Sequence, residues 1–177
     1  MVCIDGGAHN GVVTDLILFC GGISYAFEPN TILNGLLQLK YKDNPNVIVS
    51  SNALSNKFYS TKFLIDKGGI LSQGNRIGQS DMDATQESYD VKVIDLSQVI
   101  EKIILPKYQR IYLLKLDIEG EEFNVLDSIL TKKLYQHIDF IVCETHERFF
   151  SDGDVKMQKL KSRIQEYGAK NIFLDWI

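Results

Sequence analysis

Two segments near the start of the chain carry residue types that could bind a nucleoside. A short apolar run, residues 2–4, leads into Asp5-Gly6-Gly7-Ala8-His9-Asn10-Gly11, and a second apolar run, residues 23–27, leads into Glu28. Small residues after a strand let the backbone approach a ligand, and an acid after the next strand can accept hydrogen bonds from two ribose hydroxyls. This spacing predicts a site for an adenosine-containing cofactor.

The glycine spacing helps to identify that cofactor. Gly6, Gly7 and Gly11 do not form the G-x-G-x-x-G pattern that places a pyrophosphate at a helix N-terminus. Asp5, directly before the glycines, would repel a pyrophosphate but suits a cationic sulfonium with an α-amino group. The pattern therefore favours S-adenosylmethionine (SAM) over NAD. The alternative is an ordinary tight turn followed by a helix that Asn10 caps.

Acids also follow two later apolar runs, so four predicted strands end in a carboxylate: Asp5, Glu28, Asp117 and Glu144. Ligands of an open α/β sheet bind beyond the carboxyl ends of its strands, so these side chains are expected at one edge. Like charges gathered there cost stability unless something cationic joins them. A sulfonium, a metal ion or a proton would each serve.

The segment after the third predicted strand adds a further candidate contact. Asn52 is placed to contact adenine or the ribose, and the small Ala53 would let the base lie flat, although a polar turn is the alternative. His9 either lines the methionine moiety or simply widens the first turn. The residues expected to contact the cofactor are Asp5, Gly7, Ala8, His9, Asn10, Gly11, Glu28, Asn52, Ala53 and Asp117.

His146 is the candidate proton acceptor. It follows Glu144 at a strand end opposite Asp117, where carboxylates would raise its pKa and orient it. Asp117, Glu144 and His146 are therefore the candidate catalytic residues. The same three could instead hold a divalent metal ion that lowers the pKa of a hydroxyl. Glu121 and Glu122 are interpreted as acids that suit a helix N-terminus.

Hydrophobic periodicity predicts an α/β protein with a mostly parallel central sheet and helices on both faces. A polar segment, residues 66–87, is expected to be an exposed loop that covers the site or recognises the acceptor. With no internal repeat, residues 1–177 are expected to form one domain. Strands are expected at 2–4, 23–27, 47–49, 58–65, 89–94, 111–117, 140–144 and 171–177, and helices at 12–20, 32–40, 96–104, 121–130 and 155–167.

Composition narrows the function. The 177 residues carry a formal charge of −4, with a pI near 5.4, so there is no basic excess for binding duplex nucleic acid. No apolar run is long enough to span a bilayer, and no signal peptide is visible. The three cysteines have no metal-ligand spacing and favour a reducing compartment, so a cytoplasmic location is expected.

Taken together, the motifs resemble those of the FkbM-type SAM-dependent methyltransferases. The similarity extends from residue 4 to residue 147 and rests on segments 4–11, 25–30, 52–55, 93–96 and 144–146, and on Lys115-Leu116-Asp117-Ile118-Glu119-Gly120-Glu121-Glu122-Phe123. The resemblance implies a Rossmann-like class I methyltransferase fold and O-methylation, often of a sugar or polyketide hydroxyl. It also implies that Asp5, Gly7 and Glu28 contact SAM and that Asp117 lies by the transferred methyl group.

The chain departs from this family pattern at both ends. The resemblance implies a helix before the first strand and a C-terminal strand hairpin, and neither is visible in the sequence. We therefore expect a domain excised from a longer polypeptide, compatible with fusion to or partnership with glycosyltransferase domains.

The sequence thus predicts a SAM-dependent O-methyltransferase that transfers a methyl group to a hydroxyl of a sugar or glycan acceptor. One alternative is a non-catalytic SAM-binding module inside a larger glycan-assembling protein. Another is an RNA or small-molecule methyltransferase, of which the RNA enzyme is disfavoured by the acidic pI. A nucleotide-dependent oxidoreductase is disfavoured by the glycine spacing.

Overall fold

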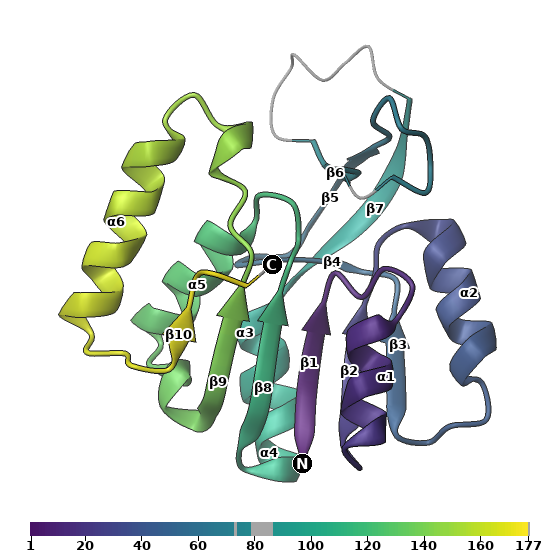
Figure 1. Ribbon diagram of the computed structural model, residues 1–177, viewed down its shortest axis with the longest axis horizontal. Coiled ribbons are helices and arrows are strands. Elements are labelled where there is room, and N and C mark those ends of the chain that lie inside the picture. The colour runs from purple at the N-terminus through teal and green to yellow at the C-terminus, as the bar shows by residue number, and fades with distance from the viewer. Residues whose placement is uncertain (73, 79–86, 177) are drawn as a thin grey trace.

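The computed structural model of the chain describes residues 1–72, 74–78 and 87–176. Within these ranges, six strands form a parallel sheet in the order β10-β9-β8-β1-β2-β3. The carboxyl ends of the strands therefore lie along one edge, the upper edge in Figure 1. The strands are β1 (Val2–Gly6), β2 (Ile23–Phe27), β3 (Val47–Ser50), β8 (Ile111–Leu116), β9 (Ile138–Cys143) and β10 (Ile172–Phe173).

Helices cover both faces of this sheet, which confirms the predicted α/β class. In Figure 1, α1 lies in front of β2, whereas α3, α4 and α5 lie behind the sheet. A π-helical stretch, Ile100–Ile104, joins α3 to α4. The helices are α1 (Val12–Phe19), α2 (Thr31–Tyr41), α3 (Leu96–Val99), α4 (Leu105–Tyr108), α5 (Glu122–Thr131) and α6 (Gly153–Glu166).

The main hydrophobic core lies between the central sheet and the helices α3, α5 and α6. Strand β8 is a nearly continuous apolar run because a central parallel strand is covered on both faces. Leu114 and Leu116 of this strand are fully buried, and the intervening Lys115 is buried as well. The helices contribute the large buried side chains Leu96, Ile100, Ile104, Leu126, Ile129, Leu130 and Leu160.

A second sheet, which the sequence did not predict, lies beyond the carboxyl edge of the first. Four strands of the described ranges pair in the order β4-β7-β5-β6, with β4 parallel to β7 and the other pairs antiparallel. In Figure 1, β5, β6 and β7 extend above the central sheet. The strands are β4 (Ala53–Ser55), β5 (Tyr59–Leu64), β6 (Arg76–Ile77) and β7 (Ser88–Asp95).

Several local predictions differ from the structure. The expected loop 66–87 contains β6, while residues 73 and 79–86 lie outside the described residues. The helix expected at 96–104 continues to Tyr108, with the π-helical stretch Ile100–Ile104 directly before the turn that contains Pro106. Of the strand expected at 171–177, the described residues form Ile172–Phe173, and residue 177 lies outside the described residues. None of the helices in the described ranges is long and apolar enough to cross a membrane.

The carboxyl ends of strands β1 and β8 lie very close together. The Asp117 N–H donates a hydrogen bond to the Gly6 carbonyl oxygen at 3.1 Å. A Cβ atom on Gly7 would lie 1.8 Å from the Asp117 carbonyl oxygen, and the φ angle of Gly7 is 74°. A glycine is therefore required where the turn after β1 lies against the end of β8.

We expect Gly7→Ala to lower the free energy of unfolding by more than Gly21→Ala does. Gly21 has nearly the same φ angle, 73°, but a Cβ there would meet nothing within 4 Å among the described residues. Gly21→Ala should therefore lower the free energy of unfolding only by the cost of placing alanine in a left-handed backbone conformation, about 1–2 kcal/mol. Denaturant unfolding of both variants measures the excess at Gly7. Equal losses in the two variants would contradict the close approach of β1 and β8.

Candidate active site

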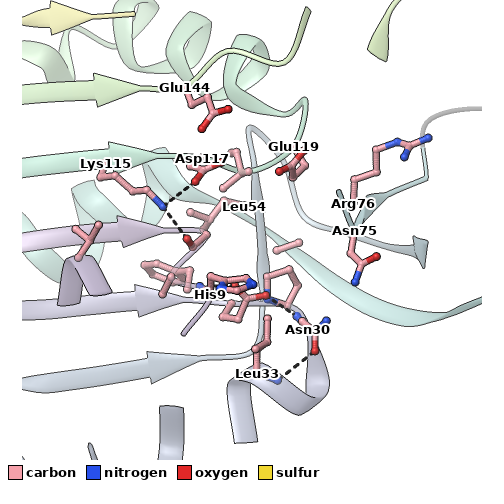
Figure 2. Close-up of a pocket in the computed structure, with 18 of the residues that line it drawn as sticks. His9, Asn30, Leu33, Leu54, Asn75, Arg76, Lys115, Asp117, Glu119 and Glu144 are labelled. Carbon is pink, nitrogen blue, oxygen red and sulfur yellow. Dashed lines mark hydrogen bonds and ion pairs between the residues drawn. The ribbon is translucent and has the colours of Figure 1, made fainter. Parts of the chain in front are cut away.

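A cavity of about 680 Å³ opens at the carboxyl edge of the central sheet. Figure 2 shows Lys115, Asp117 and Glu144 on the side of this sheet, with Arg76 of β6 and the preceding Asn75 opposite them. The volume lies in the range of about 300–1,000 Å³ that is usual for small-molecule and cofactor sites. The position is the one at which open α/β sheets bind ligands.

Most of the predicted site residues line this cavity, and they come from the turn after β1 and from the ends of β2, β3, β8 and β9. The predicted residues in the lining are Gly7, Ala8, His9, Asn10, Glu28, Asn52, Ala53, Asp117 and Glu144. The structure thus brings together segments separated by more than a hundred positions, as expected for acids at the carboxyl ends of neighbouring parallel strands.

The lining formed by the described residues does not include Asp5, Gly11 or His146. Asp5 has no exposed surface and accepts a hydrogen bond from the Thr14 hydroxyl at 2.7 Å. Gly11 precedes α1 with a φ angle of 85°, and its carbonyl oxygen accepts a hydrogen bond from the Tyr41 hydroxyl at 3.0 Å. Asp5 and Gly11 therefore do not line the cavity themselves and can affect it only through the lining residues next to them.

Glu28 ties the glycine turn to the end of β2. Its Oε2 accepts a hydrogen bond from the His9 N–H at 2.7 Å, and its Oε1 accepts one from the Asn30 N–H at 2.9 Å. The Asn30 side chain in turn caps α2 by accepting from the Leu33 N–H at 3.1 Å. Burial raises the pKa of Glu28, and the two backbone N–H groups offset part of that rise. Glu28 therefore shapes the turn as well as lining the cavity.

The ammonium group of Lys115 joins the ends of β1 and β8. Its Nζ donates hydrogen bonds to the carbonyl oxygens of Gly7 at 2.7 Å and Gly6 at 3.2 Å. It also lies 3.6 Å from Asp5 Oδ1 and 3.3 Å from Asp117 Oδ2. A buried ammonium group is tolerated only with such partners, because it has lost its hydration. Lys115 therefore links the fully buried Asp5 to the cavity.

His146 lies at the centre of a group of acids that follow β8 and β9. Its Nδ1 is 2.9 Å from Glu122 Oε1. Its Nε2 is 3.3 Å from Glu119 Oε2, 3.6 Å from Glu144 Oε1 and 3.7 Å from Asp117 Oδ1. Both ring nitrogens therefore face carboxylates, and the ring itself is 1% exposed.

This surrounding of acids sets the protonation of His146. Burial lowers the pKa of the ring, but the neighbouring carboxylates of Glu119 and Glu122 outweigh burial and raise it to about 10. The predicted direction of the shift is confirmed. A raised pKa favours the imidazolium form, whose two N–H groups face carboxylates. This arrangement suits a role for His146 in positioning the acids, and its use as the proton acceptor stays a prediction.

Glu122 and Glu121 do more than suit the start of α5. Glu122 is fully buried and accepts hydrogen bonds from the N–H groups of Ile118 at 2.8 Å and Gly120 at 2.9 Å. Glu121 accepts a hydrogen bond from the Ser55 hydroxyl of β4. Both acids lie at the predicted helix N-terminus, and both are buried. Glu122 stabilises the turn after β8, and Glu121 links that turn to the second sheet.

Sequence reasoning assigned no site role to Lys115, Glu119 or Arg76. Lys115 did leave a signal, since a lysine inside an apolar strand is seldom buried without acidic partners. Glu119 gave no such signal, because its side chain faces His146 only as a result of the turn conformation, in which the φ angle of Glu119 is 56°. Arg76 reaches the cavity through the unpredicted second sheet and lies over the Phe149 ring, 4.8 Å from its centroid.

The fold and the cavity define a class of protein, an α/β protein with a cofactor-sized site at the carboxyl edge of a parallel sheet. The sequence matches the Methyltransferase FkbM domain over residues 5–170, so the chain belongs to the FkbM methyltransferase family. A family of methyltransferases in general implies methyl transfer and SAM as the methyl donor. No curated protein matches the sequence.

One similar solved structure is methyltransferase FkbM from Methylobacillus flagellatus KT. The TM-score is 0.53 at 16% sequence identity, and the similar region covers 92% of this chain and 36% of the other. At this identity the likeness concerns the fold alone, and this chain spans well under half of its neighbour's length. The Rossmann-like methyltransferase fold implied by the sequence resemblance is confirmed.

We expect Lys115→Met to lower the free energy of unfolding by about 3–5 kcal/mol, the usual cost of removing one partner of a buried ion pair. The loss arises because Asp5 is left buried without its cation. Asp5→Asn in the same chain should recover much of it, since the amide carries no charge. Urea unfolding of the wild type, both single variants and the double variant measures the coupling. A double variant no more stable than Lys115→Met would show that Lys115 does not compensate Asp5.

Proposed function

We propose that this chain is a SAM-dependent O-methyltransferase that acts on a hydroxyl of a sugar or glycan acceptor. The observation that carries the proposal is that the same cavity is lined by the glycine turn after β1, by Glu28 after β2 and by Asp117 after β8. In a member of the FkbM methyltransferase family, these are the positions expected to surround an adenosine-containing cofactor.

The residues around the glycine turn fit SAM. Glu28 would accept hydrogen bonds from the ribose hydroxyls, while Asn52 and Ala53 would receive the adenine. The Nε2 of His9 is buried with no hydrogen-bond partner among the described residues, and such an atom is stabilised by a polar ligand group. Bound SAM supplies a methyl group activated by the positive charge of its sulfonium, and the acids near Asp117 favour that charge.

Asp117 and Glu144 are the carboxylates best placed to receive the proton of the acceptor hydroxyl. Both line the cavity, and their side chains are 31% and 36% exposed. Because a sugar hydroxyl is a very weak acid, its proton should leave as its oxygen forms the new bond to carbon. His146 Nε2 lies 3.7 Å from Asp117 Oδ1 and 3.6 Å from Glu144 Oε1, so it can position both carboxylates. Holding the reacting oxygen close to the methyl group contributes several powers of ten in rate.

Polar and aromatic residues of the cavity lining support a carbohydrate acceptor. They are Ser72, Asn75, Arg76, Arg148 and Trp176. Amide, hydroxyl and guanidinium groups suit a ligand rich in hydroxyls, and an indole ring suits the apolar face of a sugar.

The remaining expectations about the chain become proposals of the same kind. We propose that residues 1–177 form one methyltransferase domain, supported by the hydrogen bond between Ser55 of the second sheet and Glu121 at the start of α5. Cys3, Cys20 and Cys143 are free thiols, which supports a reducing compartment, the cytoplasm. A carbohydrate substrate would make glycan-assembling glycosyltransferases the natural partners.

The direct test of the proposed function uses SAM with an isotope-labelled methyl group. The purified chain is incubated with a panel of sugars and oligosaccharides, and with RNA and small hydroxylated compounds in separate arms. We expect label in a carbohydrate, seen as the mass increase of one methyl group. Label in RNA alone would replace the proposal with an RNA methyltransferase, and SAM binding without transfer to any acceptor would favour a non-catalytic SAM-binding module.

Glu28→Ala should weaken SAM binding by about 1–3 kcal/mol, because the ribose hydroxyls lose their acceptor. Isothermal titration calorimetry measures the change. Asn34→Ala is a matched control, since the Asn34 side chain donates to the Glu28 carbonyl oxygen at 3.1 Å without lining the cavity. It should alter stability but leave SAM affinity within a few fold. A Glu28→Ala chain with wild-type affinity would rule out the ribose contact.

Asp117→Asn should abolish turnover while leaving SAM affinity within a few fold. The amide keeps the size of the side chain but cannot take up a proton, so the loss should fall on the chemical step rather than on binding. Asp154→Asn makes the same chemical change at an exposed position of α6 and should leave turnover unchanged. Normal turnover in Asp117→Asn would remove Asp117 from the catalytic group.

A further inference from the structure

We propose that Asp117, Glu119 and His146 bind a divalent cation, best matched by Mn²⁺, at the end of the cavity where the acceptor hydroxyl would lie. The ligand set differs from the one expected from sequence, because Glu119 takes the place of Glu144. Binding of the ion stands by itself, whereas its use in catalysis rests on the proposed methyl transfer.

The spacing of the three side chains suits one ion. One ligand atom from each lies within 4.8 Å of the others, and His146 Nε2 is 3.3 Å from Glu119 Oε2 and 3.7 Å from Asp117 Oδ1. Atoms bound to one ion at about 2.1 Å are roughly 3 Å apart when they are neighbours and roughly 4 Å apart when they are opposite. Only small side-chain movements would therefore bring all three atoms to one ion.

Two buried atoms of this group are close enough to form an ion pair but make no hydrogen bond. His146 Nε2 and Glu119 Oε2 are both buried with no hydrogen-bond partner in the part of the chain that the structure describes. A buried nitrogen and a buried carboxylate oxygen that face each other without a hydrogen bond leave desolvation costs that a shared cation would relieve. An ion there would take the place of the Nε2 proton, since one nitrogen cannot hold both.

The imidazole is already oriented as a metal ligand should be. Its Nδ1 hydrogen-bonds to Glu122 Oε1 at 2.9 Å, and Glu122 is anchored by the N–H groups of Ile118 and Gly120. A carboxylate behind a histidine in this way fixes the ring and makes its other nitrogen a better ligand. Phe149 stacks on the ring with centroids 5.6 Å apart and planes 7° apart, which limits rotation further.

The surrounding charges leave room for a cation. Lys115 lies 3.3 Å from Asp117 Oδ2, the oxygen that does not face His146. Arg148 comes 3.9 Å from Glu119 Oε2, but its side chain is more than half exposed and can move into solvent. Carboxylate ligands suit Mg²⁺ and Mn²⁺, and the added imidazole favours Mn²⁺ of the two.

The ligand set also assigns roles within the proposed reaction. Asp117 and Glu119 line the cavity, so an ion held by them can bind the acceptor hydroxyl and lower its pKa. Glu144 lines the cavity beside them and stays outside the ligand set, which leaves it to take the hydroxyl proton as the oxygen–carbon bond forms.

The test is a Mn²⁺ titration of the purified chain, in which the electron paramagnetic resonance signal of free Mn²⁺ reports the unbound ion. Asp117→Asn and Glu119→Gln each remove one carboxylate ligand and should weaken binding at least tenfold. Glu166→Gln makes a similar change at an exposed position of α6 and should bind as the wild type does. Circular dichroism checks that each variant is folded.

A wild-type chain that does not bind Mn²⁺, or one whose affinity is the same in both ligand variants, would overturn the proposal. If a variant fails to fold, electron spin echo modulation of the wild-type complex decides: coupling to an imidazole nitrogen is expected, and its absence would exclude His146. SAM is titrated into the same samples. Mn²⁺ binding without SAM binding would contradict the proposed function alone, and SAM binding without Mn²⁺ binding would contradict the metal site alone.

Discussion

The buried ammonium of Lys115 is the interaction on which the site depends. It draws the ends of β1 and β8 together by bonding the carbonyl oxygens of Gly6 and Gly7 while pairing with Asp5 and Asp117. Removing such a cation would leave a fully buried carboxylate without compensation. The glycine turn and Asp117, which both line the cavity, are therefore held together by one side chain.

Around this link, the cavity divides into two chemically different ends. At one end, Glu28 has both oxygens engaged by backbone N–H groups, so the turn that would receive the cofactor is rigid before anything binds. At the other end, His146 lies among four carboxylates, three of which, Asp117, Glu119 and Glu144, line the cavity. A preorganised binding end and a charged reactive end are what group transfer between two bound molecules requires.

Much of this arrangement was predictable, because acids at the ends of parallel strands must meet at one edge of the sheet. Glu28, Asp117 and Glu144 were found in this way, and the hydrophobic periodicity gave the strands and helices of the central sheet. The second sheet was not predictable, since β4 and β7 pair across some forty residues with little local pattern. The protonation of His146 was not predictable in detail for a related reason: it depends on Glu119 and Glu122, whose side-chain directions are set by the turn after β8.

The central claim is that the cavity at the carboxyl edge holds SAM, and calorimetric titration of the purified chain tests it most directly. SAM, its demethylated product and NAD are titrated separately into the folded protein. The account predicts saturable binding of SAM and of the demethylated product, and none of NAD. A folded chain that binds NAD, or that binds neither SAM nor its product, would contradict the account.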